Sequence, residues 1–339
     1  VAFTTKHHDG FCLWPTDIEN PHKPGWYSER DVVGDLAEAV RARGMKFGVY
    51  YSGGLDWVFN PEPIASAGDM FRSVPTSEAY RAYVFDHFKE LIDRYHPSIL
   101  WNDIAYPPGP ELLELFAYYY NTVPDGVVND RWAQPDARWA NAPTLFLPQP
   151  APHVDFRTTE YTQLGSISPG NWEATRGIGH SFGYTKNEDP NDILTLDELV
   201  HSFVDGVSKN GNLLLNVGPQ PDGSVIDTHA ALLRSFGGWL QTYGEAVFGT
   251  RPWSSAEGTA HTDTGQEIDV RYTAKEGTVY VTFLRNPTGT SFIIENFPGE
   301  VSAVRALCGT AATFSQDGRT LTLSVAEPLA EAPAQAFAL

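Results

Sequence analysis

The chain has 339 residues, which is too long for one average domain and suits a barrel of about 250 residues followed by a smaller module. Apolar residues make up 42% of it, with 9 Trp, 15 Tyr and 19 Phe, so a large core can form and global disorder is excluded. The net charge of −19 argues against a surface for nucleic acid or anionic membranes, because binding phosphates requires clustered Lys and Arg.

Cysteine usage and the N-terminus bear on the compartment. Cys12 and Cys308 lie far apart in the sequence and form neither a disulfide framework nor zinc-finger spacing, which favours a reducing compartment such as the cytoplasm. No apolar run is long enough to cross a membrane. The first residues, VAFTT, are typical of the interior of a strand, so we expect the numbered chain to begin inside a larger protein, and any signal peptide would precede it.

Strands and helices alternate in the first part of the sequence. Strands are predicted at residues 1–8, 47–52, 98–103 and 126–131, and helices at residues 28–44, 77–95 and 111–120. Ser28 with Asp31 is typical of a capping box, and Pro97 ends the second helix. Strand, helix and strand in this order form a parallel crossover unit, and its repetition predicts a β/α barrel.

The alternation is less regular up to residue 243. Residues 132–152 are rich in Pro, Ala and Gln and are predicted to form a surface loop at the mouth of the barrel. Further elements are a strand at 178–184, a helix at 195–209, a strand at 212–217 and a helix at 227–243. About six barrel-type strands result where a closed barrel needs eight, so we expect the first strands to be absent from this chain.

Beyond Gly249 the helical period disappears. Short strands between Pro and Gly turns are predicted at residues 268–272, 279–284, 292–296, 301–307 and 321–325. Such closely spaced strands predict an antiparallel sandwich. The expected organisation is therefore a catalytic β/α barrel domain over residues 1–249 and a C-terminal β-sandwich domain over residues 250–339.

Several side chains suited to chemistry follow predicted strands. Asp103 ends the strand SILWND, and the carboxyl ends of barrel strands line the mouth where barrel enzymes keep their active sites. The same rim would receive His7, His8, Tyr50, Trp101 and Arg131, and two later carboxylates are Glu160 and Glu173. Two carboxylates with aromatic and His neighbours suit hydrolysis of a glycosidic bond, although Asp103 could also merely cap the following turn.

A metal site is the second interpretation of the first histidines. His7, His8 and Asp9 could seed the site of a metallohydrolase. Adjacent residues of a strand face opposite sides, however, so both His side chains would rarely reach one ion. Alternatively, one histidine belongs to the core and the other faces solvent. We expect neither a metal ion nor an organic cofactor.

Seven ordered segments are similar to one known family. They are TTKHHDGFCLWPT, KFGVYYSGGLDW, LWNDIAYP, VVNDRW, DFRTTEY, WEATRGIGHSFGY and NGNLLLNVGPQPDGSV. They resemble the α-L-fucosidases of glycoside hydrolase family 29 over almost all of residues 1–250. The resemblance implies an imperfect (β/α)8-type barrel, lacking its first strands in this chain, with a C-terminal antiparallel β-sandwich. It also implies a retaining enzyme that removes terminal α-L-fucose through a covalent fucosyl-enzyme.

The resemblance further implies roles for single residues. Asp103 matches the nucleophile and Glu160 the acid/base, with Glu173 as the second candidate for the acid/base. Residues that match sugar-binding positions are His7, His8, Tyr50, Trp101, Arg131 and Phe182, the last of them packing on the fucose methyl. The implied substrate is a small molecule or glycan with terminal α-L-fucose, and a homo-oligomer is left open. The alternative function is a fucose-binding protein with an incomplete, inactive site, because the N-terminal segment is expected to be missing.

Overall fold

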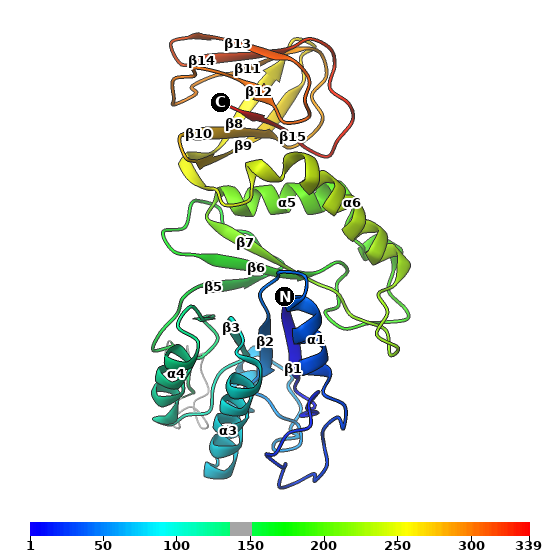
Figure 1. The fold of residues 1–339 in the computed structure, drawn as a ribbon, viewed down its shortest axis with the longest axis vertical. Helices are drawn as coiled ribbons and strands as arrows, with labels where there is room; N and C mark the ends of the chain where they lie inside the picture. Colours follow the sequence, from blue (N-terminus) through cyan, green and yellow to red (C-terminus); the bar gives the residue numbers. More distant parts are fainter. Residues whose placement is uncertain (136–150) are drawn as a thin grey trace. The chain divides into compact units, whose positions relative to one another are not determined.

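A parallel sheet with helices between its strands builds the first of two units in this computed structural model (Figure 1). The units are Val1–Arg157 and Thr158–Leu339, and the structure describes residues 1–135 and 151–339. The sheet has the order β1 (Ala2–Lys6), β2 (Gly48–Ser52), β3 (Ile99–Asp103) and β4 (Val127–Val128). The helices are α1 (Val32–Arg41), α2 (Ala67–Arg72), α3 (Glu78–Tyr95) and α4 (Glu111–Thr122). The predicted alternation is confirmed, and only α2 was not predicted.

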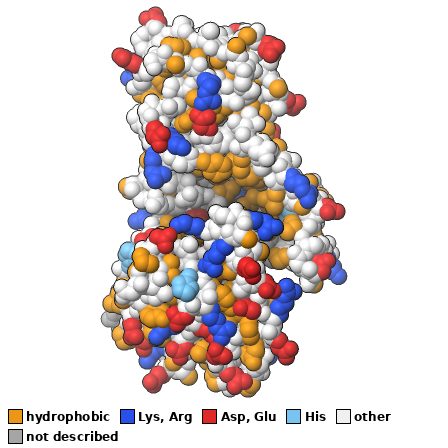
Figure 2. Space-filling view, viewed as in Figure 1, with side chains coloured by type: hydrophobic (Ala, Val, Ile, Leu, Met, Phe, Trp, Pro, Cys, Tyr) orange, Lys and Arg blue, Asp and Glu red, His pale blue; other side chains and the backbone are white. Residues whose placement is uncertain are grey.

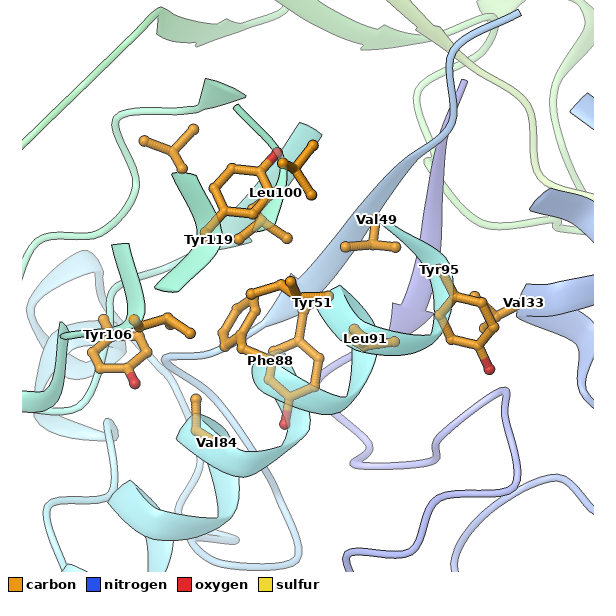
Figure 3. Close-up of a cluster of buried hydrophobic side chains, with 14 of the residues drawn as sticks. Val33, Val49, Tyr51, Val84, Phe88, Leu91, Tyr95, Leu100, Tyr106 and Tyr119 are labelled. Carbon is orange, nitrogen blue, oxygen red and sulfur yellow. The ribbon is translucent and has the colours of Figure 1, made fainter. Parts of the chain in front are cut away.

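Helix α3 presents an apolar face to the sheet. Its predicted face is buried, and consists of Tyr80, Val84, Phe88, Leu91, Ile92 and Tyr95. Figure 3 shows Phe88 and Leu91 beside side chains of β2 and β3, in one buried cluster. The helix begins after Ser77, whose side chain accepts a hydrogen bond from the Tyr80 amide, and ends at His96 in a left-handed conformation before Pro97. Burial of this face fixes β2 and β3, which carry the candidate site residues.

Two boundaries in the first unit differ from the predictions. Asp31, rather than Ser28, caps α1, because its carboxylate accepts a hydrogen bond from the Gly34 amide at 2.8 Å. The strand predicted at 126–131 is reduced to β4, because the side chain of Asn129 replaces backbone pairing by donating to Asn102 O at 2.9 Å. The loop predicted at 132–152 falls mostly on residues 136–150, which lie outside the described residues.

The second unit begins with a three-stranded sheet. Its strands are β5 (Arg157–Glu160), β6 (Trp172–Gly177) and β7 (Gly211–Asn216), with β6 and β7 parallel. The strand predicted at 178–184 is wrong, because that segment forms bends and irregular backbone and the strand is β6. Glu173 and Arg176 interrupt the apolar pattern of β6 and so hid it, although Trp172 is fully buried.

Helices and an antiparallel sheet complete the second unit. The helices are η2 (Pro190–Asp192), α5 (Leu196–Ser208), α6 (Asp227–Tyr243) and η3 (Gly244–Ala246). Thr195 and Glu198 form the capping box that opens α5. The sheet strands are β8 (Arg251–Thr262), β9 (Glu267–Lys275), β10 (Thr278–Phe283), β11 (Ser291–Ile294), β12 (Arg305–Ala306), β13 (Ala312–Asp317), β14 (Thr320–Val325) and β15 (Gln335–Ala338).

This eight-stranded sheet has the order β12-β15-β10-β9-β8-β11-β14-β13 and surrounds one core. Four of the five strands predicted beyond Gly249 are confirmed as β9, β10, β11 and β14. The fifth, at 301–307, is reduced to the two residues of β12. Strands β8, β13 and β15 were not predicted. The antiparallel character predicted for this region is therefore confirmed.

Helices α5 and α6 share a core with the antiparallel sheet. Val200 and Trp239 cluster with Tyr280 of β10 and Ala336 of β15. Trp239 Nε1 also donates to Ala334 O at 3.0 Å. These contacts explain why α5 and α6 fall in the same unit as the sheet. The domain boundary at 249/250 coincides with the change from helix to strand before β8 and stays a prediction.

Surface charge is mixed on the face drawn in Figure 2, where Asp and Glu side chains are interspersed with Lys and Arg. Among the residues that the structure describes, no helix is both long and apolar enough to span a membrane.

His87, on α3, makes the stability of the first unit depend on pH. It is fully buried, its Nδ1 accepts from Tyr51 Oη at 2.8 Å, and its Nε2 donates to Ile18 O at 3.2 Å. Burial, and next the charge of Lys6, lowers the pKa of His87 to about 3. Between about pH 6.5 and pH 3, the His87 imidazole is therefore protonated in the unfolded chain and neutral in the folded chain. The contribution of His87 to the free energy of unfolding is complete above pH 6.5 and is lost as the pH falls towards 3.

We expect the free energy of unfolding to change less steeply with pH in His87→Gln. The slope between pH 5 and 4 should fall by about 1.4 kcal/mol per pH unit, which corresponds to one proton. Urea denaturation at several pH values measures this slope. The exposed His261 supplies a matched control, His261→Gln, which should keep the wild-type slope. A wild-type slope in His87→Gln would contradict the assignment.

Candidate active site

Asp103 is the last residue of β3 and is held by three hydrogen-bond donors. Its side chain is 11% exposed. Tyr50 Oη donates to Oδ2 at 2.6 Å, while Arg131 and the amide of Ile104 donate to Oδ1 at 2.8 and 2.9 Å. The β2–β3 register places Tyr50 opposite Trp101 and Ser52 opposite Asp103. These donors can stabilise a negative charge on the carboxylate, and together they fix its orientation.

The chain turns sharply after Asp103, and close backbone packing holds the turn. Ile104 has φ 69°, a left-handed conformation that is strained for a β-branched residue. This conformation directs the Ile104 amide back to the Asp103 carboxylate. Gly53 and Gly54 lie against the turn, since a Cβ on Gly54 would meet Ala105 N at 2.8 Å. Only glycine fits so close an approach.

Tyr50, Trp101 and Arg131 form an ordered stack beside the carboxylate. The rings of Tyr50 and Trp101 stack at 5.3 Å between centroids, and the Arg131 guanidinium lies 4.6 Å from the Trp101 ring. The side chain of Asn102 holds the backbone of Arg131 by donating to Arg131 O at 2.8 Å. The guanidinium is thereby positioned both by an aromatic face and by its ion pair with Asp103.

His7 and His8 lie in the turn that follows β1, on the side of Tyr50. The His7 ring stacks on Tyr50 at 5.7 Å, and the two imidazole centroids are 4.0 Å apart. The prediction that the two would face opposite sides of a strand is wrong, because β1 ends at Lys6 and the strand alternation no longer applies. Burial lowers the pKa of His7, and burial together with His7 lowers the pKa of His8 to about 4. Both rings are therefore neutral at neutral pH.

A buried ion pair that was not predicted from the sequence lies next to these histidines. Lys6 Nζ is 3.1 Å from Asp56 Oδ2, and both side chains are fully buried. Lys6 also donates to Ser52 O at 3.1 Å. The Trp57 amide, next to Asp56, donates to His8 O at 2.7 Å. Because a buried Lys needs a partner, Lys6 in the strand AFTTK was the available signal that a carboxylate must approach it.

The remaining predicted residues belong to the second unit. Glu160 is exposed at the end of β5, Glu173 is half-buried on β6, and Phe182 is 37% exposed, with its ring 5.3 Å from that of Tyr161. Tyr161, with φ 52°, links the end of β5 to the segment after β6, because its hydroxyl donates to Gly179 O and accepts from the Gly177 amide. The pairing of Asp103 with Glu160 stays a prediction.

We name His7, His8, Tyr50, Trp101, Asp103 and Arg131 the Asp103 cluster. It combines one carboxylate, one cation paired with it, neutral imidazoles and an aromatic stack. Such a site suits a neutral ligand that offers several hydroxyl groups. In the described ranges 1–135 and 151–339, no three His, Cys, Asp or Glu side chains group as metal ligands would.

Comparison with known proteins points to one family. The family profile described as Alpha-L-fucosidase matches residues 1–245. The chain is 31% identical to the mouse tissue alpha-L-fucosidase and 32% identical to the human plasma alpha-L-fucosidase, in each case over 85% of this chain. It spans only 60% and 59% of those relatives' lengths.

Among solved structures, the alpha-fucosidase of Thermotoga maritima in complex with a mechanism based inhibitor is similar. The two chains are 41% identical, with a TM-score of 0.86, and the match covers 99% of this chain and 74% of the other. A bacterial isoenzyme from Paenibacillus thiaminolyticus matches with 25% identity and a TM-score of 0.77. These similarities confirm the predicted fold class, a β/α barrel-type domain with a C-terminal β-sandwich.

Proposed function

Because this chain belongs to the α-L-fucosidase family of glycoside hydrolases, we propose that it hydrolyses terminal α-L-fucosyl linkages with retention of configuration. The observation that carries the proposal is the Asp103 carboxylate, which is complemented by Tyr50 and Arg131 beside an aromatic stack. The relatives named above are fucosidases, so the comparisons do not favour the alternative of a binding protein without activity.

In the proposed first step, Asp103 attacks the anomeric carbon of fucose. A bond forms between a carboxylate oxygen and C1, the bond from C1 to the leaving oxygen breaks, and Glu160 gives its proton to that oxygen. Oδ2 is the better attacking atom, since it accepts one hydrogen bond while Oδ1 accepts two. Retention requires the two carboxyl groups to stand about 5–5.5 Å apart.

In the second step, water takes the place of the leaving group. Glu160 removes a proton from water, the water oxygen attacks C1, and the bond to Asp103 breaks to regenerate the carboxylate. Two inversions give net retention. The Arg131 guanidinium, which pairs with Asp103, stabilises the negative charge that returns to the carboxylate when it departs in this step.

Recognition of fucose in this proposal relies on neutral hydrogen-bonding groups and apolar faces. His7 and His8 exchange hydrogen bonds with sugar hydroxyls as neutral rings. Phe182 packs on the C6 methyl, where a hydroxymethyl would lose hydration against an apolar wall. The proposed substrates are small molecules or glycans that end in α-L-fucose.

The test is the stereochemical course of hydrolysis. With nitrophenyl α-L-fucoside as substrate, proton NMR should detect α-L-fucose as the first product, followed by mutarotation to the β anomer. The β-L-fucoside of the same phenol is the matched control and should not be hydrolysed. Initial release of β-L-fucose would contradict retention. Equilibrium binding of fucose without release of nitrophenol would overturn the proposal in favour of the binding protein.

A further inference from the structure

Ser52, at the end of β2, joins His8 to the loop that follows the strand. It is fully buried. His8 Nδ1 lies 2.6 Å from Ser52 Oγ, and Ser52 Oγ lies 2.9 Å from Leu55 O. The backbone carbonyl of Ser52 accepts from Lys6 Nζ. The side chain and the main chain of Ser52 therefore both make hydrogen bonds, and one of the partners, His8, belongs to the Asp103 cluster.

The hydroxyl of Ser52 carries a single hydrogen, and this decides the direction of both contacts. Leu55 O can only accept, so the hydroxyl hydrogen must point to it if both contacts are hydrogen bonds. Ser52 Oγ then has only lone pairs to offer to His8, and the hydrogen of that bond must sit on His8 Nδ1. The reverse arrangement would leave the Leu55 carbonyl without the hydroxyl hydrogen inside a buried turn, which is costly.

We propose that Ser52 is a positioning residue that fixes the tautomer of His8, with the hydrogen on Nδ1 and the lone pair on Nε2. Nε2 of His8 then accepts a hydrogen bond, so a ligand hydroxyl that binds to Nε2 must donate its hydrogen. The ring takes up no second proton near neutral pH, because its pKa is about 4. This inference rests on the proposed function only for the identity of the ligand.

The consequence is a directional requirement on the sugar. An analogue whose hydroxyl opposite His8 is methylated keeps its oxygen but cannot donate to Nε2, so it should bind as poorly as the deoxy analogue. Were Nε2 to carry the hydrogen instead, the methylated oxygen could still accept it. The Nδ1–H tautomer therefore predicts equally weak binding of the two analogues, whereas the Nε2–H tautomer predicts that the methylated analogue binds better than the deoxy analogue.

The direct test reads the tautomer without using activity. Long-range nitrogen–proton NMR spectra of the full chain, labelled in its 10 histidine rings, distinguish the two neutral tautomers, and His8→Gln identifies the His8 signals. The wild type should show the Nδ1–H form, and Ser52→Ala should shift His8 to the Nε2–H form or to a mixture. An Nε2–H signal in the wild type, or an unchanged Nδ1–H signal in Ser52→Ala, would overturn the proposal.

Kinetics give the second readout. Ser52→Ala should lower kcat/KM about tenfold or more on the aryl fucoside, while Ser52→Thr, which keeps the hydroxyl, should restore both the His8 signals and most of the activity. Ser208→Ala is the matched control, since Ser208 is also fully buried and its hydroxyl also donates to a backbone carbonyl, that of Asp205. A chain without fucosidase activity that still shows the Ser52-dependent tautomer would refute the proposed function and leave this inference standing.

Discussion

Replacement of Asp103 by alanine should lower kcat/KM for nitrophenyl α-L-fucoside by about 10⁴-fold or more, while the protein remains folded. The expected loss is large because the variant lacks the oxygen that we propose forms the covalent bond to C1, and the remaining groups can only bind the sugar and polarise the leaving oxygen. Circular dichroism shows whether the variant is folded. A nitrophenyl leaving group needs little protonation, so the measurement isolates the role of the nucleophile.

Azide distinguishes a nucleophile from a residue that merely shapes the site. The truncated side chain leaves room for azide, which should attack C1 from the side vacated by the carboxylate and give β-L-fucosyl azide, with partial recovery of nitrophenol release. Asp125→Asn is the control, because Asp125 is exposed and pairs with Lys46 at the surface. Full activity in Asp103→Ala would exclude Asp103 as the nucleophile. Loss of activity without any azide product would restrict Asp103 to binding.

Substitution of Lys6 by methionine should destabilise the first unit by about 3–5 kcal/mol, because it leaves the Asp56 carboxylate buried without its cation. Asp56→Asn should cost a similar amount for the converse reason. When both changes are combined, the loss should be well below the sum of the two, because neither charge is then left unpaired. Urea denaturation measures these free energies of unfolding.

The surface pair between Lys46 and Asp125 provides a matched control for Lys6. Its side chains are 70% and 73% exposed, so Lys46→Met removes the same charge from a solvated pair and should leave the denaturation midpoint nearly unchanged. Equal midpoints for Lys6→Met and Lys46→Met would contradict the structural importance of the buried pair. Strictly additive effects in the double variant would show that Lys6 and Asp56 act independently.

Elements with local signals were the most predictable parts of this molecule. Helix α3 has a predicted apolar face that is buried throughout, a serine cap and Pro97 beyond its end, and both of its ends fall where these signals put them. Thr195 and Glu198 marked the start of α5 in the same way. The strand ending at Asp103 was equally clear, because β3 is a short apolar run between a proline and a polar turn.

Elements that depend on pairing with distant residues were less predictable. Strand β6, with the sequence WEATRG, contains no apolar run, and β15 is defined by its antiparallel pairing with β10 and β12. The site shows the same limit. Asp103 and Tyr50 could be proposed from strand ends, whereas the contacts of Ser52 with His8 and of Lys6 with Asp56 join residues more than forty positions apart. The catalytic roles themselves remain predictions until the variants are measured.

The tight packing of Gly53 and Gly54 limits how the substrate range of this protein could be altered in the laboratory. A library that randomises these two positions would be filled with proteins unable to form the turn after Asp103, because each new side chain would collide with Asn102 or with the backbone at Ala105. Trp57, a few residues later, is 51% exposed, and its ring makes an edge-on contact with that of His8, with 5.9 Å between the centroids. Diversity introduced at Trp57 would change what lies next to His8 and leave the turn intact.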